Sequence, residues 1–342
     1  MKKRFIALFI TGILTGNLWA QLKTPKEFGF QAFSLEDSML GTINFYVSKN
    51  KIEESKPLLV LLDGSGHLPI YSKVKKSDGT SFIFSSNPFR YKAISEKYHV
   101  VLISKPGVPF LDSLKAESQQ EFKRNYPPSK AYTKHLSLDW RVNTTSKIID
   151  YLTQELVVKD NEVIAIGYSE GGHVVPKLAL INKKVKKIVN IVGGGLNQFN
   201  DFITENRLKG QKGLISAVEA QQNVDSLYAV FDDIYKNPLS TDNFWLGHTY
   251  KRWASFCKDI PLENMLSLDI PILLISGGQD QNTPIAGLDY VKLEFLRNNK
   301  TNLTYKVYPN CDHWFNDQKM NSNRLLEMID FVFDWIGSSR EV

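Results

Sequence analysis

Short runs of apolar residues alternate along the chain with segments whose apolar residues recur at helical spacing. Continuous apolar runs predict strands that are buried on both faces of a parallel sheet. Such runs occur at residues 57–62, 99–104, 163–166, 187–192, 271–276 and 303–308. Apolar positions near 3.6-residue spacing predict helices at 140–156, 170–181 and 324–336. Because strands and helices alternate, we expect a mostly parallel central sheet flanked by helices on both faces.

Four other stretches depart from this alternation. Residues 27–49 predict two strands with a turn near 39–41, whereas 67–97 and 105–139 show no clear strand pattern and predict long loops. Residues 196–268 carry only helical patterns, at 199–208, 215–222, 226–235 and 245–256. We interpret this stretch as a helical cap inserted between two late strands, which leaves 21–195 and 269–342 as the core. A helical excursion away from the functional site is the alternative.

The first twenty residues have the pattern of a secretory signal peptide. Three basic residues precede an apolar run from Phe5 to Leu18, and Trp19-Ala20 then precede the polar Gln21. This arrangement predicts cleavage after Ala20. The run is short for a membrane-spanning helix, which needs about 20 apolar residues, although an uncleaved anchor or internal helix is the alternative. We therefore expect a secreted or periplasmic protein with no stable membrane span after cleavage.

Composition and charge exclude several classes of protein. The 342 residues are 42% hydrophobic and 23% charged, close to globular averages and unlike disordered, collagen-like or polytopic membrane chains. The net charge of +6 falls to about +3 without the basic residues of the leader, and no long Lys/Arg run is interleaved with aromatics. A nucleic-acid partner is therefore not expected. Two cysteines, Cys257 and Cys311, exclude a disulfide framework and leave open one disulfide or two buried thiols.

The most informative motif is Gly167-Tyr168-Ser169-Glu170-Gly171, which lies between a predicted strand and a predicted helix. In a nucleophile elbow, a Gly-x-Ser-x-Gly sequence places the serine on a sharp strand-to-helix turn. The helix amino end then stabilises negative charge beside the serine. The motif therefore predicts Ser169 as a nucleophile, and a plain turn with an exposed serine is the alternative.

A serine nucleophile needs a base, and the base needs a carboxylate that orients it. Of six histidines, only His313 follows the last predicted strand, and Asp280 lies in a glycine-rich loop after the strand at 271–276. We predict His313 as the base and Asp280 as its carboxylate. Weaker alternatives are Asp312 or Asp289 as the carboxylate and a direct role for His173; we expect His99 to be structural.

With these motifs, residues 55–337 resemble the α/β-hydrolase superfamily, whose triads follow the order Ser…Asp…His. The Ser-Glu-Gly-Gly context looks most like that of secreted esterases and serine peptidases. The resemblance implies an α/β-hydrolase fold, a catalytic triad of Ser169, Asp280 and His313, and no cofactor.

An oxyanion hole in this fold needs two backbone N–H donors. The resemblance implies that one comes from Glu170, which follows the nucleophile, and the other from Ser65 in the loop 63–67, with Gly64 or Gly66 as alternatives. Asp63 stands where many relatives have histidine, which leaves the identity of the second donor open.

Several side chains are candidates for substrate binding. His67 follows the oxyanion loop, and the aromatic residues Trp245, Tyr250 and Trp253 of the cap can line an apolar pocket. The alternatives are a surface histidine and a cap helix that packs on its own core. The Glu170 side chain can either pair with a substrate amine or make a local contact.

Taken together, these patterns predict a serine hydrolase that cleaves a carboxylic ester through an acyl-enzyme on Ser169. No metal-binding pattern and no phosphate-binding loop is present in the sequence. We expect a small-molecule ester or a short peptide as the substrate. The alternatives are a serine peptidase or aminopeptidase with the same triad, and a non-catalytic binding protein on this scaffold.

Overall fold

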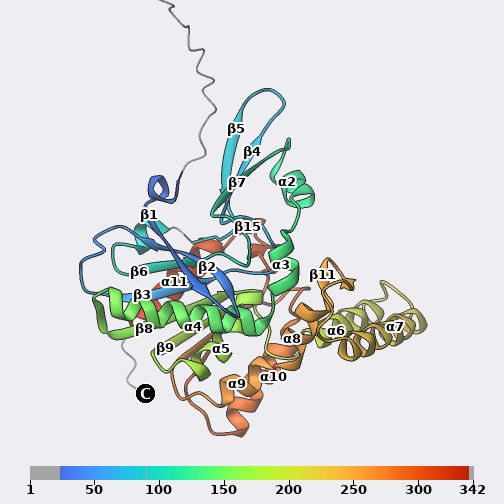
Figure 1. Ribbon diagram of the computed structural model, residues 1–342. Helices are drawn as coiled ribbons and strands as arrows, with labels where there is room; N and C mark the ends of the chain where they lie inside the picture. Colours follow the sequence, from blue (N-terminus) through green and yellow to red (C-terminus); the bar gives the residue numbers. More distant parts are fainter. Residues whose placement is uncertain (1–23, 90, 339–342) are drawn as a thin grey trace, which may run out of the picture.

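The computed structural model describes residues 24–89 and 91–338, so the predicted signal peptide at 1–20 lies outside the described residues. An eight-stranded sheet runs through the described chain in the order β1-β2-β6-β3-β8-β9-β12-β13 (Figure 1). Its strands are β1 (Phe30–Asp37), β2 (Gly41–Ser48), β3 (Lys56–Leu62), β6 (His99–Ile103), β8 (Val158–Tyr168), β9 (Val185–Ile191), β12 (Ile272–Gly277) and β13 (Leu303–Tyr308). A short 3₁₀ helix, Pro25–Phe28, precedes β1.

The sheet is mostly parallel, as the apolar runs predict. Strands β1, β2 and β6 pair antiparallel at one edge, and every later pair is parallel. Strand β8 lies between β3 and β9, and Leu58–Leu62 pair with Val163–Gly167. Because parallel strands end at the same edge, the loops after β3, β8, β12 and β13 meet there.

Helices cover both faces of the sheet (Figure 1). Helices α4 (Leu138–Glu155), α5 (Glu170–Ile181), α9 (Pro261–Leu266) and α10 (Ile285–Arg297) share one apolar core with one sheet face. Helices α1 (Tyr91–Ile94) and α11 (Leu325–Gly337) cover the other face. This confirms the predicted α/β-hydrolase architecture. Two-residue strands β14 (Asn316–Asp317) and β15 (Ser322–Asn323) form a small hairpin before α11.

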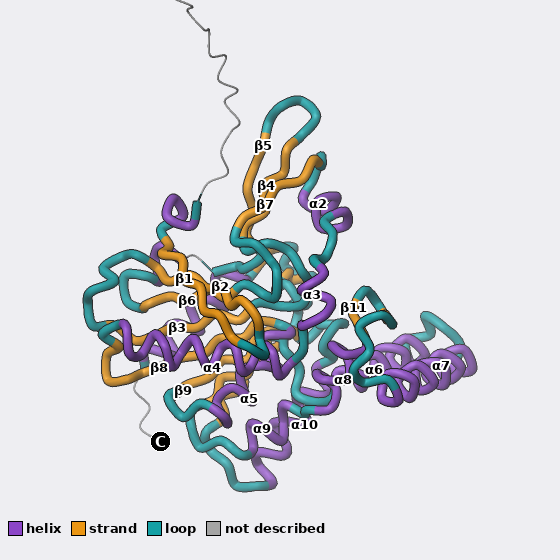
Figure 2. Tube along the Cα trace, viewed as in Figure 1, coloured by secondary structure: helices purple, strands orange, loops and turns teal. Residues whose placement is uncertain are grey.

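The two predicted long loops instead contain a second sheet, so that prediction is wrong. Strands β4 (Tyr71–Lys75), β5 (Ser81–Ser85) and β7 (Leu111–Lys115) pair in the order β5-β4-β7, followed by α2 (Gln119–Asn125) and α3 (Lys130–His135). Figure 2 shows this sheet projecting beyond the central one. Its strands are five residues long and largely half-exposed, and its core is small, built on Val74, Ala116 and Phe122. Such strands carry no continuous apolar run.

The insertion between β9 and β12 is mainly helical, in agreement with the sequence pattern. It contains α6 (Gln198–Gln211), α7 (Ala217–Lys236), the short hairpin β10 (Phe244–Trp245) and β11 (His248–Thr249), α8 (Tyr250–Lys258), and α9. The segments predicted at 215–222 and 226–235 form one helix, α7. The segment predicted at 245–256 begins five residues late, because the side chain of Thr249 caps α8 by accepting from Arg252 N–H.

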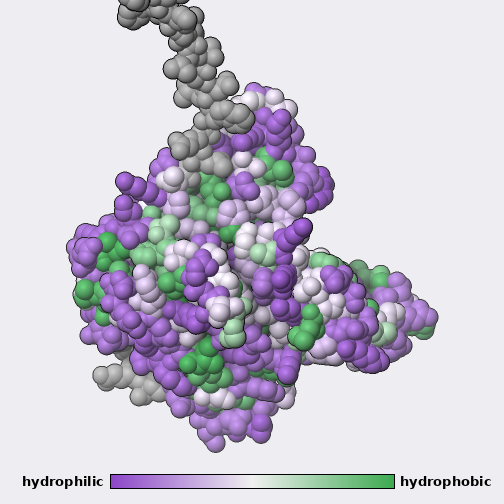
Figure 3. Space-filling view, viewed as in Figure 1, coloured by the Kyte–Doolittle hydropathy of each residue, from purple (hydrophilic) through white to green (hydrophobic). Residues whose placement is uncertain are grey.

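The face of the molecule shown in Figure 3 is mostly polar, and the apolar residues on it form small, scattered groups. No helix in this part of the chain is long and apolar enough to cross a membrane. Cys257 and Cys311 are both buried free thiols, so of the two readings left open by the sequence the structure shows the unpaired one.

Candidate active site

Ser169 lies on the turn between β8 and α5 with a strained backbone. Its φ of 51° and ψ of −117° fall outside the regions that side-chain-bearing residues usually occupy. The turn is held by Ser169 N–H, which donates to Ile191 O at 2.8 Å, and by Gly172 N–H, which donates to Ser169 O at 2.8 Å. Strain of this kind persists only where the surrounding structure fixes it, and it clusters at functional sites.

The glycines on either side of Ser169 are needed because the backbone segments approach closely. A Cβ atom at Gly167 would lie 2.1 Å from Gly171 O, and one at Gly171 would lie 2.1 Å from Leu62 O. Any side chain at these two positions would push α5 away from β3 and β8. The Gly-x-Ser-x-Gly spacing therefore has the steric cause that the elbow interpretation requires.

The three side chains predicted for the triad contact one another in series. His313 Nε2 lies 3.1 Å from Ser169 Oγ, and His313 Nδ1 lies 2.7 Å from Asp280 Oδ2. Because the carboxylate can only accept, Nδ1 donates to it and Nε2 is left to accept from the serine hydroxyl. The chain thus brings together residues up to 144 positions apart in sequence.

Asp280 and His313 are both buried and are held by neighbours. Thr283 Oγ1 donates to Asp280 Oδ2 at 2.6 Å, while the amides of Asn282 and Thr283 donate to Oδ1. The hydroxyl of Tyr168 donates to His313 O at 2.7 Å and fixes the backbone that carries the imidazole. Thr283 lies in the same glycine-rich loop as Asp280, where residues 277–284 read Gly-Gly-Gln-Asp-Gln-Asn-Thr-Pro, and its place three residues after Asp280 is the signal from which its role could have been predicted.

The competing residues make other contacts. Asp312 accepts from the amides of Trp314 and Asn316, and Asp289 accepts from Tyr305 Oη. His99 is fully buried in β6 and donates from Nε2 to Glu54 O, a structural contact as predicted. His173 is buried one helical turn after Ser169 and does not contact it in the described structure.

The loop after β3 lies against the nucleophile. A Cβ atom built on Gly64 would stand 3.3 Å from Ser169 Cβ, and Ser65 follows at the rim of the site. Within the described residues the Ser65 amide has no backbone acceptor, and Glu170 is the first residue of α5, where helix amides lack intrahelical partners. The buried ammonium of Lys105 holds the loop by donating to Gly64 O at 2.5 Å and to Gly66 O at 2.8 Å.

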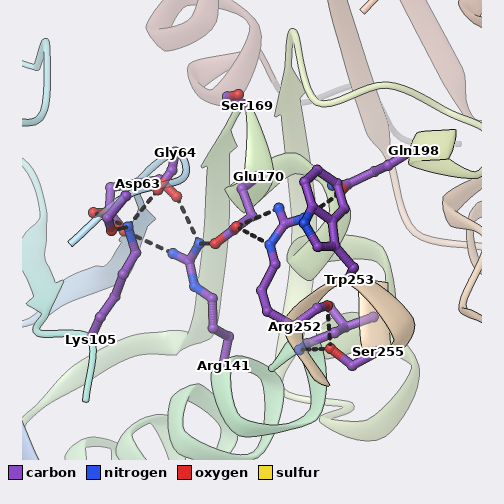
Figure 4. A network of polar contacts seen from close by, with 12 residues as sticks. Asp63, Gly64, Lys105, Arg141, Ser169, Glu170, Gln198, Arg252, Trp253 and Ser255 are labelled. Atoms are coloured by element: carbon purple, nitrogen blue, oxygen red, sulfur yellow. Dashed lines mark hydrogen bonds and ion pairs between the residues drawn. The ribbon is translucent and has the colours of Figure 1, made fainter. Parts of the chain in front are cut away.

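The Glu170 side chain turns away from the substrate side and into a buried network of charges (Figure 4). Its Oε1 accepts from Arg141 at 2.8 Å, and its Oε2 accepts from Arg252 Nε at 3.0 Å and Nη2 at 2.6 Å. Arg141 also binds Asp63, which pairs with Lys105. Both carboxylate oxygens of Glu170 are thus engaged within the fold, which is the local contact that the sequence offered as one of two readings.

Burial and ion pairing shift the pKa values of these charged side chains in opposite directions. Burial alone would raise the pKa of Glu170, but the charges of Arg252, Arg141 and Lys105 lower it well below its usual range. Burial lowers the pKa of Lys105, and the nearby Asp63 partly opposes this.

Sequence reasoning missed Lys105, Arg141 and Arg252. The available signal was weak: an arginine on the apolar face of the helix predicted at 140–156.

Two cavities meet at Ser169. The larger, about 430 Å³, is lined by the loop after β3, by Pro88 and Leu68, and by Trp314 and Leu325. The smaller, about 200 Å³, is lined on the cap side by Gln198, Asp201, Phe202, Arg252 and Trp253. Ser65, Ser169, Asn282 and His313 border both. A substrate bound at Ser169 can therefore extend in two directions.

Only one of the four predicted substrate-contacting side chains lines these cavities. His67 donates from Nε2 to Tyr126 O at 2.6 Å and packs against Tyr126. Trp245 packs in the cap's own core, and Tyr250 donates its hydroxyl to Asp233. Trp253 is the exception: it belongs to the cap core and also lines the smaller cavity. His67, Trp245 and Tyr250 therefore use their polar atoms or rings in contacts within the fold, and His67 is half-buried.

Residues 145–317, just over half of the chain, match the family described as BAAT / Acyl-CoA thioester hydrolase C terminal. A comparison with curated proteins finds no match.

Within the residues that the structure describes, no group of three or more His, Cys, Asp or Glu side chains is arranged to hold a metal ion.

Solved structures with the same fold include several hydrolases. An acylaminoacyl peptidase of Pyrococcus horikoshii matches with a TM-score of 0.56 and 13% identity, over 92% of this chain and 42% of that one. A protein described as a dienelactone hydrolase of Klebsiella pneumoniae gives 0.51 and 11%, over 90% of this chain and 99% of that one. An esterase of Pyrococcus furiosus gives 0.50 and 14%, over 93% and 96%.

At these identities the structural likeness shows the fold. The family match covers strand β8 and the elbow that carries Ser169, the helical insertion, and the loops of Asp280 and His313. The chain therefore belongs to the BAAT / acyl-CoA thioester hydrolase C-terminal family and is a hydrolase of the α/β-hydrolase superfamily.

Proposed function

We propose that the protein is a serine hydrolase that cleaves a carboxylic ester through an acyl-enzyme on Ser169. The observation that carries the proposal is the hydrogen-bonded series from Ser169 Oγ through His313 to Asp280, at the point where two cavities meet. A nucleophile, a base and an orienting carboxylate in contact are the arrangement that acyl transfer needs.

The proposed reaction uses each of these groups in turn. His313 Nε2 takes the hydroxyl proton as Ser169 Oγ attacks the ester carbonyl carbon, and Asp280 stabilises the imidazolium that forms. The amides of Glu170 and Ser65 donate to the oxyanion. His313 then protonates the leaving alcohol, and the acyl group stays on Ser169. Water, deprotonated by His313, attacks the acyl carbon. The bond to Ser169 Oγ breaks, His313 returns the proton to Oγ, and the acid is released.

The family match favours a second candidate, hydrolysis of a thioester at the same serine, because the matching family is described by that reaction. The chemistry of the acyl-enzyme is the same, and the two candidates differ only in the leaving group. A serine peptidase or aminopeptidase requires protonation of an amine leaving group instead. A non-catalytic binding protein is disfavoured by the intact contacts among Ser169, His313 and Asp280.

Labelling with a fluorophosphonate followed by peptide mapping tests the nucleophile. We expect one adduct, on Ser169, which is absent in Ser169→Ala and formed about 10³-fold or more slowly in His313→Ala. The matched controls are Ser226→Ala, on the exposed part of α7, and His135→Ala in α3, which should label at the normal rate. An adduct elsewhere, or none in folded protein, contradicts the mechanism.

A substrate panel separates the reaction classes. It contains p-nitrophenyl esters, acyl thioesters and aminoacyl p-nitroanilides with the same acyl groups. We expect the highest kcat/KM on esters. Faster thioester cleavage would instead select the second candidate, and turnover of anilides alone would identify a peptidase.

We also propose that the chain is exported and cleaved after Ala20. The basic start followed by the apolar run from Phe5 to Leu18 supports this proposal. Intact-mass measurement of protein recovered from the extracytoplasmic fraction should give a chain that begins at Gln21, and a full-length chain retained in cells would contradict it.

A further inference from the structure

The smaller cavity contains a carboxyl group that the proposed mechanism does not use. Asp201 lies in the first turn of α6 and lines this cavity beside Ser169 and His313. Within residues 24–89 and 91–338, its carboxyl has no hydrogen-bond donor and no basic partner that influences it. A carboxylate placed in a cavity next to a nucleophile without a counter-charge is a candidate ligand-binding group.

The other polar groups of this cavity are already engaged or uncharged. Arg252 directs Nε and Nη2 to Glu170 and Nη1 to Gln198 Oε1, so all three of its nitrogens have partners. Glu170 is likewise held by Arg252 and Arg141. His173 is buried and its pKa is lowered to about 3 by burial and by the charge of Arg252, so the imidazole is neutral. None of these groups can neutralise Asp201.

The surroundings of Gly194 show which groups lie near the Asp201 carboxyl. A Cβ atom at Gly194 would be 3.2 Å from His173 Nε2, 3.7 Å from Asp201 Oδ2 and 3.7 Å from Thr283 Cγ2. Asp201 Oδ2 and His173 Nε2 thus lie close to the same point beside this glycine. Burial, together with the nearby Asp280 carboxylate, raises the pKa of Asp201 well above its usual range, and a cation bound beside this carboxyl would favour its charged form and lower that pKa again.

We propose that Asp201 binds a cationic ammonium group of the substrate, and that the smaller cavity thereby selects esters that carry a positive charge on one side of the scissile bond. Phe202 and Trp253 also line the cavity, and aromatic faces attract organic cations. An alkylammonium group suits one carboxylate and aromatic walls, whereas a metal ion would need more ligands than Asp201 alone. The inference rests on the proposed ester hydrolysis and names the substrate class.

Isosteric esters test the proposal on both sides of the scissile bond. Acetylcholine, the acetic ester of choline, and its neutral isostere 3,3-dimethylbutyl acetate differ by charge in the leaving group. The p-nitrophenyl esters of 4-(trimethylammonio)butanoate and 5,5-dimethylhexanoate differ by charge in the acyl group. We expect the charged member of one pair to have a kcat/KM about tenfold or more above its neutral isostere, equivalent to one buried charge contact. In Asp201→Asn this ratio should fall to near one.

Control variants separate a local contact from a general charge effect. Asp232→Asn removes the same charge from an exposed, Lys236-paired position on α7, and it should retain the wild-type preference. Asp201→Glu should retain part of it because the charge remains. The proposal is overturned if the wild-type protein shows no preference in either pair, if Asp201→Asn keeps the preference, or if Asp232→Asn loses it equally.

A binding measurement makes the outcome independent of turnover. Calorimetric titration of Ser169→Ala with choline and with 3,3-dimethylbutanol should show tighter binding of choline, weakened about tenfold by adding Asp201→Asn. If no ester is hydrolysed but choline binds in this way, the proposed function fails and the cation site stands. If esters are hydrolysed and choline binds no better than its neutral isostere, the cation site fails alone.

Discussion

At the scale of single residues, the backbone of Ser169 stores strain where the chemistry is proposed. A side-chain-bearing residue at φ 51° and ψ −117° costs about 1–3 kcal/mol relative to relaxed backbone. Glycine occupies this region at little cost. The elbow therefore gives up stability in order to present the hydroxyl to His313.

Replacement of Ser169 by glycine should raise the free energy of unfolding by about 1 kcal/mol. Ser169→Ala removes the same hydroxyl but keeps the strained backbone, and it is the matched control. Urea denaturation of both variants provides the measurement. If the glycine variant is no more stable than the alanine variant, the backbone of Ser169 is not strained in solution.

Glu170 is the residue on which the buried charges depend. In Glu170→Gln, the negative charge between Arg141 and Arg252 is lost, and the single amide oxygen replaces two carboxylate oxygens that now accept from both arginines. Leaving buried charge uncompensated costs about 3–5 kcal/mol. Denaturant unfolding should show this loss, whereas Glu205→Gln, which breaks a part-exposed pair with Lys209 on α6, should cost about 0–1 kcal/mol.

The same residue predicts a pH dependence of stability. The folded-state pKa of Glu170 lies below its ordinary value of 4.5, so the folded protein holds this carboxylate charged more strongly than the unfolded chain does. Its stabilisation is complete above pH 4.5 and is lost as the pH falls toward the folded-state pKa. Between pH 5 and pH 3, the difference in unfolding free energy between wild type and Glu170→Gln should therefore shrink. A constant difference would refute the linkage.

At the scale of elements, the cap has its own aromatic core. Phe199 of α6 stacks on Phe231 of α7 with ring centroids 3.9 Å apart, and Trp253 of α8 packs beside them. This core is separate from the two that cover the central sheet. Local loosening of α6 and α7 should therefore occur without unfolding of the sheet.

Phe199→Ala should open that core. The expected loss is about 3–5 kcal/mol, as for other large-to-small changes at buried aromatic residues. Hydrogen exchange should show faster amide exchange in α6 and α7 and unchanged exchange in β3 and β8. Val218→Ala, at an exposed site on α7, is the control and should leave exchange unaltered. Equal acceleration in the central strands would mean that cap and core unfold together.

Helices with one apolar face and strands buried on both faces were predictable from the sequence. Strand β12 is buried at every position, so its continuous apolar run has no other reading. Strands β4 and β5 are short and half-exposed, and their side chains resemble those of a loop. The hairpin before α8 was missed because Trp245 lies at helical spacing from Trp253 in the sequence. Trp245 belongs to β10, however, and its ring packs against the ring of Trp253 in α8.

At the scale of the whole molecule, the positions of Ser169, Asp280 and His313 were predictable because each follows a strand of the central sheet, and these parallel strands end at one edge. The charge network was not, because its members come from α4, α5, α8 and the loops after β3 and β6, and an ion pair between distant segments leaves no local periodicity. The position of the Asp201 carboxyl beside the nucleophile was hidden for the same reason, because its cavity is lined by segments distant in sequence, among them α5, α8 and the loop after β12.

The bridge from Glu170 to Arg252 has a consequence for modular exchange of the insertion between β9 and β12. Arg252 is supplied by that insertion, whereas Glu170 belongs to the elbow. A chimaera with a foreign insertion must therefore place a basic side chain where Arg252 lies. Otherwise the buried Glu170 carboxylate keeps only Arg141 as its ion-pair partner. New specificities are more readily grafted onto this scaffold by redesigning α6 beyond Gln198, since α6 provides Asp201 while Gln198, which accepts from Arg252, is kept.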